Sequence, residues 1–255
     1  MQDYLRAAAS RVRETARIGP FLATFARYSR DPALNYAIPD HDVEPTPPAV
    51  AALVDAYRRR GLMPRLEYLP ALAPAVETSF QDAGFVVEQR LPLMVCTPAT
   101  LRDPVAPADL VLRAVADEAT LHDLAAVQHD AFDDPPPTRA DIDDRRATIA
   151  AGAAAIVAYG AADNPAGAGV RDVSAHHVAE IAGIGVRRDF RRHGVAAAVT
   201  ARLARDAFDA GLDLVFLTAA HDEGQRSYER AGFVLSSTVL SLALPPHKKA
   251  RHGFH

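Results

Sequence analysis

Two stretches of this chain carry the same pattern of glycines and apolar runs. Each begins with Gly-Leu, at Gly61 and at Gly211, continues into an apolar run, and reaches a Gly-Phe pair at Gly84 and at Gly232. The two spacings, 23 and 21 residues, differ by an amount that a loop can absorb. Both stretches predict the order helix, strand, helix, Gly-Phe, strand, so we expect an internal repeat of one α/β unit. Chance similarity of two such units is the alternative.

Composition sets the class of protein. The chain has 255 residues, which is long for one compact domain and short for two full ones. A formal charge of −4 argues against a protein built mainly to bind nucleic acid, and no stretch approaches the ~20 apolar residues that span a bilayer. Arginines interrupt every apolar run near the N-terminus, so no signal peptide is expected, and the single Cys96 allows no intrachain disulfide. We therefore predict a cytoplasmic protein with neither a nucleic-acid nor a membrane partner.

A loose group of prolines separates two periodic regions of the chain. Pro98, Pro104 and Pro107 follow Cys96 in a stretch without periodicity, which is typical of a domain boundary. We predict a helical segment with a partial α/β unit over 1–97, a complete domain over 108–244 and a tail over 245–255. Residues 248–255 of that tail are expected to be disordered.

Apolar patterns alternate between strand and helix on both sides of the boundary. Strands are predicted at 66–69, 85–95, 110–114, 153–159, near 170, and at 178–186, 214–217 and 233–244, with a turn at 163–169. Helices are predicted at 73–83, 118–132, 138–150 and 194–210. A last short helix is expected to be capped by Asp222 with Gln225 and ended by Gly232. The predicted fold class is α/β with a mixed sheet.

The segment from Glu180 to Ala196 carries the most informative chemistry. A predicted strand runs into a short basic loop, which opens directly into a helix at Gly194. The first N–H groups of a helix have no intrahelical partner and lie at the positive end of the helix dipole, so they can hold a phosphate or pyrophosphate. Four arginines are expected around that anion: Arg187, Arg188, Arg191 and Arg192.

Two motifs in this region resemble a known family. Arg191-x-x-Gly194-x-Ala196 resembles the Gln/Arg-x-x-Gly-x-Gly/Ala signature of the GCN5-related N-acetyltransferases, and Tyr228-x-x-x-Gly232-Phe233 resembles the family's Tyr-x-x-x-Gly-Phe. The resemblance covers 108–244, in the family's order of strands and helices. It implies an acyl-CoA N-acyltransferase fold that moves an acetyl or short acyl group from CoA to a primary amine by direct attack in a ternary complex. A generic strand–helix turn with surface arginines is the alternative.

The resemblance also implies which residues bind acetyl-CoA. The pyrophosphate is expected on the basic loop and the pantetheine arm alongside 184–186. The residues expected to contact the cofactor are Ile184, Gly185, Val186, Arg191, Arg192, His193, Gly194, Val195 and Ala196. His221 stands seven residues before Tyr228, where many family members have an asparagine that bonds the pantetheine amide, and this departure puts that contact in doubt. No metal is expected.

Two residues are candidates for proton transfer. Glu180 lies 11 residues before Arg191, where many family members have a glutamate that deprotonates the amine. Alternation along the strand is expected to put Glu180, Ala182, Ile184 and Val186 on one face. Tyr228 is the candidate acid for the CoA thiolate. The alternatives are a strand-edge glutamate paired with an arginine, and a tyrosine that packs against the cofactor.

The first copy of the repeat is expected to be non-catalytic. Phe80 stands where Tyr228 stands in the second copy, and Glu44 lies in an acidic loop at the position counted as equivalent to Gly194. Residues 1–96 also leave little room for the early strands of a complete domain. We therefore expect one site per chain.

Several other features have open alternatives. His176-His177 fits a turn before a strand, and a pair of metal ligands is the alternative. Acidic residues around 130–144 form either a solvated helix face or part of an acceptor site for a cationic amine. The predicted partner is a small-molecule or peptide amine, and the predicted assembly is a monomer or homodimer. A sensor that binds acyl-CoA without turnover is the alternative function, and a scaffold for a partner protein is the third; Glu180 and Tyr228 favour the enzyme.

Overall fold

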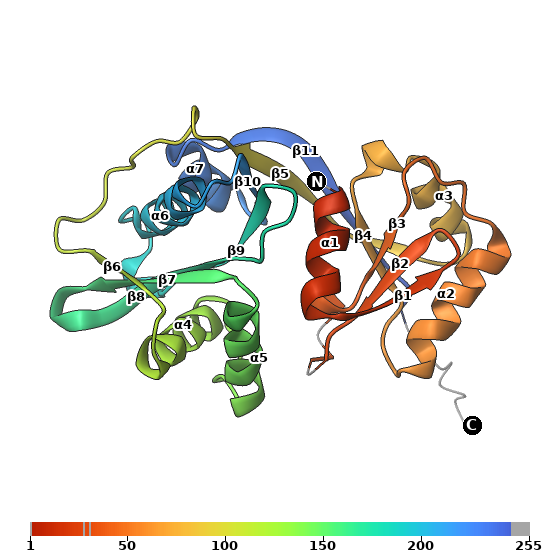
Figure 1. The fold of residues 1–255 in the computed structure, drawn as a ribbon, viewed down its shortest axis with the longest axis horizontal. Helices are drawn as coiled ribbons and strands as arrows, with labels where there is room; N and C mark the ends of the chain where they lie inside the picture. Colours follow the sequence, from red (N-terminus) through yellow and green to blue (C-terminus); the bar gives the residue numbers. More distant parts are fainter. Residues whose placement is uncertain (1, 28, 31, 246–255) are drawn as a thin grey trace, which may run out of the picture. The chain divides into compact units, whose positions relative to one another are not determined.

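The computed structural model describes residues 2–27, 29–30 and 32–245, which fold as two compact units (Figure 1). Unit 1 comprises 2–12 and 91–238, and unit 2 comprises 13–90 and the C-terminal segment that begins at Val239. The predicted division into 1–97 and 108–244 as folding domains stays a prediction. The segment expected to be disordered, 248–255, lies outside the described residues.

Unit 1 contains a mixed sheet in the strand order β5-β10-β9-β8-β7-β6. Its strands are β5 (Val86–Cys96), β6 (Val111–Ala114), β7 (Ala154–Gly160), β8 (Asn164–Arg171), β9 (Val178–Val186) and β10 (Leu214–Thr218). β6 to β9 form an antiparallel meander, and β10 is parallel to β9. The predicted turn at 163–169 is wrong over most of its length, because β8 begins at Asn164 and its small residues Ala166 and Ala168 fit into the core.

Helices cover both faces of this sheet. Unit 1 contains α1 (Gln2–Val12), α4 (Glu118–Ala131), α5 (Arg139–Ala150), α6 (Val195–Asp209) and α7 (Asp222–Arg230). In Figure 1, α4 and α5 lie on one side of β7, β8 and β9, and α6 lies on the other. Val195, Val199 and Leu203 of α6 are buried together with Ile156 and Ile181 of the sheet. This apolar layer fixes the start of α6 beside the end of β9.

One helix start differs from its prediction. Asp222 was expected to cap α7 with Gln225, but His221 occupies the N-cap position and no side chain caps it. The Gln225 amide instead donates to Glu229 one turn later. Asp222 therefore lies in the first turn, where its negative charge interacts favourably with the helix dipole.

Unit 2 repeats the central topology of unit 1. Its sheet has the order β1-β2-β3-β4-β11, formed by β1 (Glu14–Ile18), β2 (Phe21–Phe25), β3 (Ala37–Pro39), β4 (Arg65–Tyr68) and β11 (Val234–Ala243). β1 to β3 are antiparallel, and α2 (Pro47–Arg59) connects β3 to the parallel strand β4. Three short strands precede α2, against four strands and two α-helices between β5 and α6 in unit 1, so the early part of the first copy is present in reduced form.

The final strand of each repeat completes the sheet of the other unit. β5 follows α3 (Ala75–Asp82) of unit 2, but its residues Leu93 to Cys96 pair with β10 in unit 1. β11 follows α7 of unit 1, but its residues Leu240 to Ala243 pair with β4 in unit 2. Each unit thus needs one strand from the other half of the chain.

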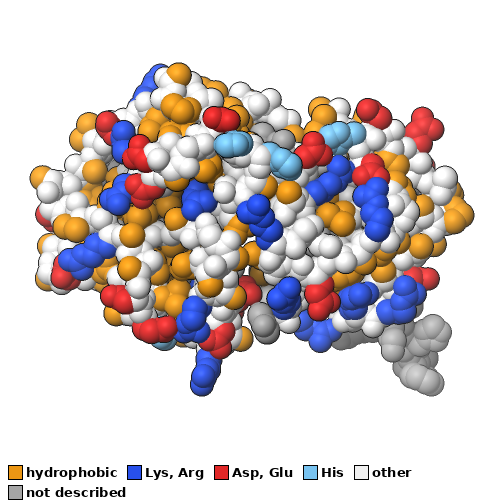
Figure 2. Space-filling model, viewed as in Figure 1, with side chains coloured by type: hydrophobic (Ala, Val, Ile, Leu, Met, Phe, Trp, Pro, Cys, Tyr) orange, Lys and Arg blue, Asp and Glu red, His pale blue; other side chains and the backbone are white. Residues whose placement is uncertain are grey.

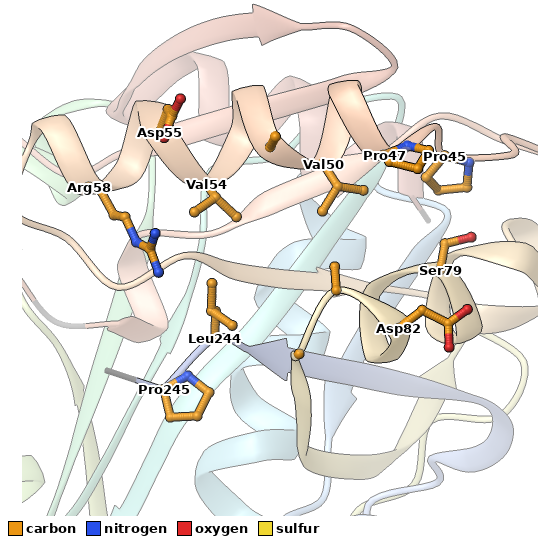
Figure 3. Close-up of a pocket in the computed structure, with 13 residues that line it drawn as sticks. Pro45, Pro47, Val50, Val54, Asp55, Arg58, Ser79, Asp82, Leu244 and Pro245 are labelled. Carbon is orange, nitrogen blue, oxygen red and sulfur yellow. The ribbon is translucent and has the colours of Figure 1, made fainter. Parts of the chain in front are cut away.

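A groove of about 1040 Å³ lies in unit 2 between α2 and α3 (Figure 3). Val50 and Val54 of α2 line it together with Leu244, and Asp82 of α3 lies at its edge. None of the residues predicted to bind cofactor or to transfer protons lines this groove. On the face drawn in Figure 2, acidic and basic side chains are interspersed, which fits the small net charge. No helix among the described residues combines the length and apolar character needed to cross a membrane.

Candidate active site

The candidate site begins where β9 and β10 separate. β10 pairs with β9 only through Val178 to Glu180, opposite 214–216. Residues 181–186 of β9 continue past that point with β8 as their partner on the other side. Peptide groups of β9 on the side of the missing strand can therefore bond an extended ligand, apart from the carbonyl groups of Gly183 and Val186, which accept from Gln128 and Arg191. Three of the predicted cofactor residues, Ile184, Gly185 and Val186, lie on this open segment.

A β-bulge interrupts β9 within the open segment. The register moves from Val170 opposite Ala182 to Ala168 opposite Gly185, so β9 contains one extra residue. Gly183 adopts a left-handed φ of 60°, which tolerates the irregular backbone. A bulge of this kind re-aims the side chains and peptide groups that follow it.

Because of the bulge, the prediction that Glu180, Ala182, Ile184 and Val186 lie on one face of β9 is wrong. Ile184 lies on the α6 side, because its Cδ1 is 2.3 Å from where a Cβ at Gly169 would be, next to Leu203. Gly185 faces α4, since a Cβ there would lie 2.9 Å from the Cβ of Ala131. Strict alternation failed because the extra residue exchanges the two faces. Glu180 and Ala182, before the bulge, therefore do not share a face with Ile184 and Val186.

The side chain of Gln128 in α4 stabilises the bulge by a hydrogen bond, and the sequence analysis did not identify this residue. Its side chain is 2% exposed, and Nε2 donates to the carbonyl oxygen of Gly183 at 2.7 Å. Its Oε1 has no hydrogen-bond partner among the described residues. A buried amide on an otherwise apolar helix face was the available signal, because such groups are normally hydrogen-bonded.

The loop after β9 forms a helix start that lacks a cap. Gly194 is the N-cap residue of α6 with a left-handed φ of 85°, and no side chain caps the helix. Arg192 is also left-handed, with φ of 65°. A Cβ at position 194 would lie 2.6 Å from the carbonyl oxygen of Val105. Glycine is therefore required by both conformation and space, and the first N–H groups of α6 remain available to an anion.

The four arginines of this loop have different environments. Arg191 donates from Nε to the carbonyl oxygen of Val186 at 3.1 Å and from Nη2 to that of Ala131 at 3.0 Å. Arg187 pairs with Asp130 at 3.3 Å. These two guanidinium groups hold the loop against α4 and β9. Arg188, Arg192 and His193 are exposed. The predicted contact of Arg191 with a cofactor stays a prediction.

The cofactor residues of β9 and α6 meet beside β8. A Cβ at Gly167 would lie 2.6 Å from Val195 Cγ1, 3.2 Å from the Gly185 carbonyl oxygen and 3.4 Å from Val186 Cγ2. Gly167 therefore lets the end of β9 and the start of α6 approach each other. The fold brings Gly185, Val186, Gly194 and Val195 into one neighbourhood.

Glu180 and Tyr228 lie on different elements of unit 1. Glu180 is half-buried at the last residue that β9 pairs with β10. Tyr228 of α7 is half-buried against the core layer on the α6 side, and its hydroxyl has no hydrogen-bond partner among the described residues. Burial raises the pKa of Tyr228, so its phenol stays protonated at neutral pH. His221 is exposed at the N-cap of α7, and its predicted contact stays a prediction.

The remaining candidates have structural roles. His176 and His177 form a two-residue turn with φ of 52° and 58°, which confirms the turn interpretation. Among the described residues, no group of three or more potential metal ligands gathers. In the acidic region, Asp141 caps α5 through Thr138, whose hydrogen bonds lower the pKa of that carboxyl group.

Solved structures with this fold come from several bacteria. A GCN5-related N-acetyltransferase from Kribbella flavida superposes with a TM-score of 0.80 at 23% identity, covering 96% of this chain and 94% of that one. One described as a putative acetyltransferase of the GNAT family from Novosphingobium aromaticivorans gives 0.59 at 16% identity, covering 94% and 96%. A tandem GNAT protein from the clavulanic acid biosynthesis pathway gives 0.59 at 13%, covering 89% and 79%. No curated protein matches the chain.

These likenesses show the fold over nearly the whole chain. On this fold, an uncapped helix start lies beside an open strand segment, an arrangement that can bind an elongated anion. Residues 117–233 match the model of the acetyltransferase (GNAT) family. This segment, which contains both motifs, is therefore similar to the GNAT family, as the motifs predicted.

Proposed function

We propose that this domain transfers an acetyl or short acyl group from CoA to a primary amine by direct attack in a ternary complex. The observation that carries the proposal is the separation of β9 from β10 directly beside the uncapped start of α6. An elongated thioester with a pyrophosphate at one end requires both an open strand segment and an anion site.

The proposed binding mode assigns a role to each part of that surface. The pyrophosphate accepts hydrogen bonds from the first N–H groups of α6, next to Gly194. The pantetheine arm extends along the open segment, where Ile184 to Val186 offer peptide groups. The exposed guanidinium groups of Arg188 and Arg192 add positive charge near the phosphates.

The proposed chemistry uses Glu180 and Tyr228 as base and acid. The amine nitrogen forms a bond to the thioester carbonyl carbon, and the carbon–sulfur bond breaks. Glu180 accepts the proton that the amine loses, directly or through water, and Tyr228 donates a proton to the departing thiolate. The raised pKa of Tyr228 supports this assignment, because an acid must be protonated when the thiolate leaves.

The proposed acceptor is a small-molecule or peptide amine. Exposed Asp133 and Asp134 follow α4 in the loop before α5, and their charge would attract a cationic amine. A cytoplasmic location and a monomeric or homodimeric state are further parts of the proposal.

Release of free thiol from acetyl-CoA across a panel of amines tests the proposal. An amine-dependent release that a thiol reagent detects would support acyl transfer. Acetyl-CoA binding by calorimetry, without release with any amine, would instead identify a sensor. A chain that neither binds acetyl-CoA nor releases thiol would overturn both functions.

A further inference from the structure

Tyr4 of the N-terminal helix α1 is buried against the strand that carries Glu180. The Tyr4 side chain is 2% exposed, and its ring packs edge-on against Phe216 of β10 with 5.1 Å between centroids. Its hydroxyl donates to the carbonyl oxygen of Val173 at 3.1 Å and accepts from the backbone N–H of Glu180 at 3.0 Å. A side chain from outside residues 117–233 thus contacts the proposed base directly.

The hydroxyl of Tyr4 bonds to the backbone of β9 at the level where β8 ends. The backbone N–H of Asp172, just after β8, donates to the Glu180 carbonyl oxygen at 2.8 Å. The Glu180 N–H donates to the Tyr4 hydroxyl. Arg171 donates from Nη1 to the Asp172 carbonyl oxygen. The Tyr4 hydroxyl thus links the backbone of Glu180 to that of Val173 through two hydrogen bonds.

A second contact holds α1 in this place. Arg11, at the other end of the helix, donates from Nη1 to the carbonyl oxygen of Ser174 at 2.7 Å. Tyr4 and Arg11 thus attach the two ends of α1 to consecutive residues of the loop that joins β8 to β9. The helix fixes this loop and, through it, the first residues of β9.

We propose that Tyr4 is a positioning residue for the acyl-transfer reaction. Its hydroxyl fixes the backbone of Glu180 at the point where β9 and β10 separate, and so sets the direction of the carboxylate. The inference rests on the proposed role of Glu180 as the base. It adds that the N-terminal helix, which precedes the first repeat, is part of the catalytic apparatus.

Tyr4→Phe tests this role, because it removes the hydroxyl and keeps the ring on Phe216. We expect kcat to fall by about tenfold, the effect of one lost hydrogen bond at a site that must hold its geometry. The KM for acetyl-CoA should stay within about twofold, since the start of α6 is unchanged. Tyr57→Phe is the matched control: the Tyr57 hydroxyl is equally buried and donates to the Thr24 carbonyl oxygen in unit 2. It should leave kcat unchanged.

A double-mutant cycle separates positioning from general loss of stability. With Glu180→Gln already present, Tyr4→Phe should cause no further loss of kcat, because the carboxylate that it orients is gone. Multiplied losses in the double variant, or an unchanged kcat in Tyr4→Phe alone, would overturn the inference. If Glu180→Gln alone had no effect on kcat, the proposed base would be wrong instead. Acetyl-CoA binding by calorimetry confirms that each variant is folded.

A second variant tests the role of α1 even if Tyr4→Phe does not fold. Arg11→Ala weakens the attachment of α1 and leaves the Tyr4 hydroxyl intact. We expect kcat to fall by about twofold at an unchanged KM for acetyl-CoA, and less than for Tyr4→Phe. A KM that rises while kcat is constant would show that α1 serves cofactor binding and would overturn the positioning role.

Discussion

The two units share a topology but differ at the start of the helix that connects their parallel strands. In unit 1, α6 begins after Gly194 with Val195 and Ala196, whose N–H groups are available. In unit 2, α2 begins with Pro47 and Pro48, which have no N–H groups to offer. The same fold position therefore offers the first two helical N–H groups in unit 1 and lacks both in unit 2.

The two helix starts correct the residue that was taken as equivalent to Gly194 in the first copy. Counting from Gly61 aligned Glu44 with Gly194, but the helix starts place Thr46 at that position. The conclusion that the first copy is non-catalytic stays a prediction, now supported by the two prolines. Phe80, the counterpart of Tyr228, is fully buried between Phe21 and Phe85. Its site is filled with core side chains.

Deletion of residues 1–96 should have the largest effect of these changes, because it removes most of unit 2 and parts of unit 1. Unit 1 would lose α1 and the strand β5, and residues 240–243 of β11 would lose their partner β4. We expect aggregation, or a melting temperature lowered by more than about 10 °C. Calorimetric melting and gel filtration measure this. A 97–255 fragment as stable as the whole chain would contradict the need for strand exchange.

Gly194→Asp should abolish acetyl-CoA binding. The added carboxylate faces the pyrophosphate, and the residue must adopt a φ of 85° with Val105 close by. Gly194→Ala separates strain from charge and should weaken binding less. Thr46→Asp, at the matching position of unit 2, should change nothing. Calorimetry should give one acetyl-CoA per wild-type chain; two per chain, or unchanged binding in Gly194→Asp, would refute the difference between the units.

Glu180→Gln should lower kcat by ~10²-fold near neutral pH and leave acetyl-CoA binding intact, as expected on losing a general base. Glu44→Gln is the matched control, since this exposed glutamate of unit 2 lies in the loop before α2. Steady-state kinetics with a reactive amine measure the effect. Undiminished turnover at pH 7 would assign proton removal to another group or to solvent.

Tyr228→Phe, which gives unit 1 the residue of unit 2, should have a smaller effect than Glu180→Gln, about tenfold on kcat. Burial raises the pKa of Tyr228 above its ordinary value of 10.0. The acid form therefore persists as pH rises, and wild-type kcat should show no loss from this group until the pH exceeds that value. The pH–rate profile measures this. A loss of kcat between pH 8 and 9 that Tyr228→Phe removes would contradict the raised pKa.

Local patterns predicted the elements well, and contacts distant in sequence were not predictable. The strand at 178–186 has the predicted bounds, because its apolar residues and flanking turns are local signals. The bulge at Gly183 was missed because one extra residue leaves composition and periodicity almost unchanged. β3, with three residues, is too short to produce a pattern.

In the candidate site, too, the local motif was predicted and the contacts between distant residues were not. The motif at Arg191 to Ala196 located the uncapped helix start, since such a loop is contiguous in the chain. Gln128 and Tyr4 act on β9 from 55 and 176 residues away, and the pattern around them does not show that β9 is their partner. Only the folded chain shows that a buried amide and a buried phenol support the strand.

The exchange of β5 and β11 has a consequence for folding during synthesis. Tyr4 leaves the ribosome long before Glu180, which is 176 residues later. At about 5–20 residues per second, α1 waits roughly 10 to 35 s for the strand against which it packs. Unit 2 waits about as long, because Leu240 of β11 lies 172 residues after its partner Tyr68 of β4. The first half therefore cannot complete its sheet as it emerges, and the unpaired edge of β4 must be kept apart from other chains until β11 has been made.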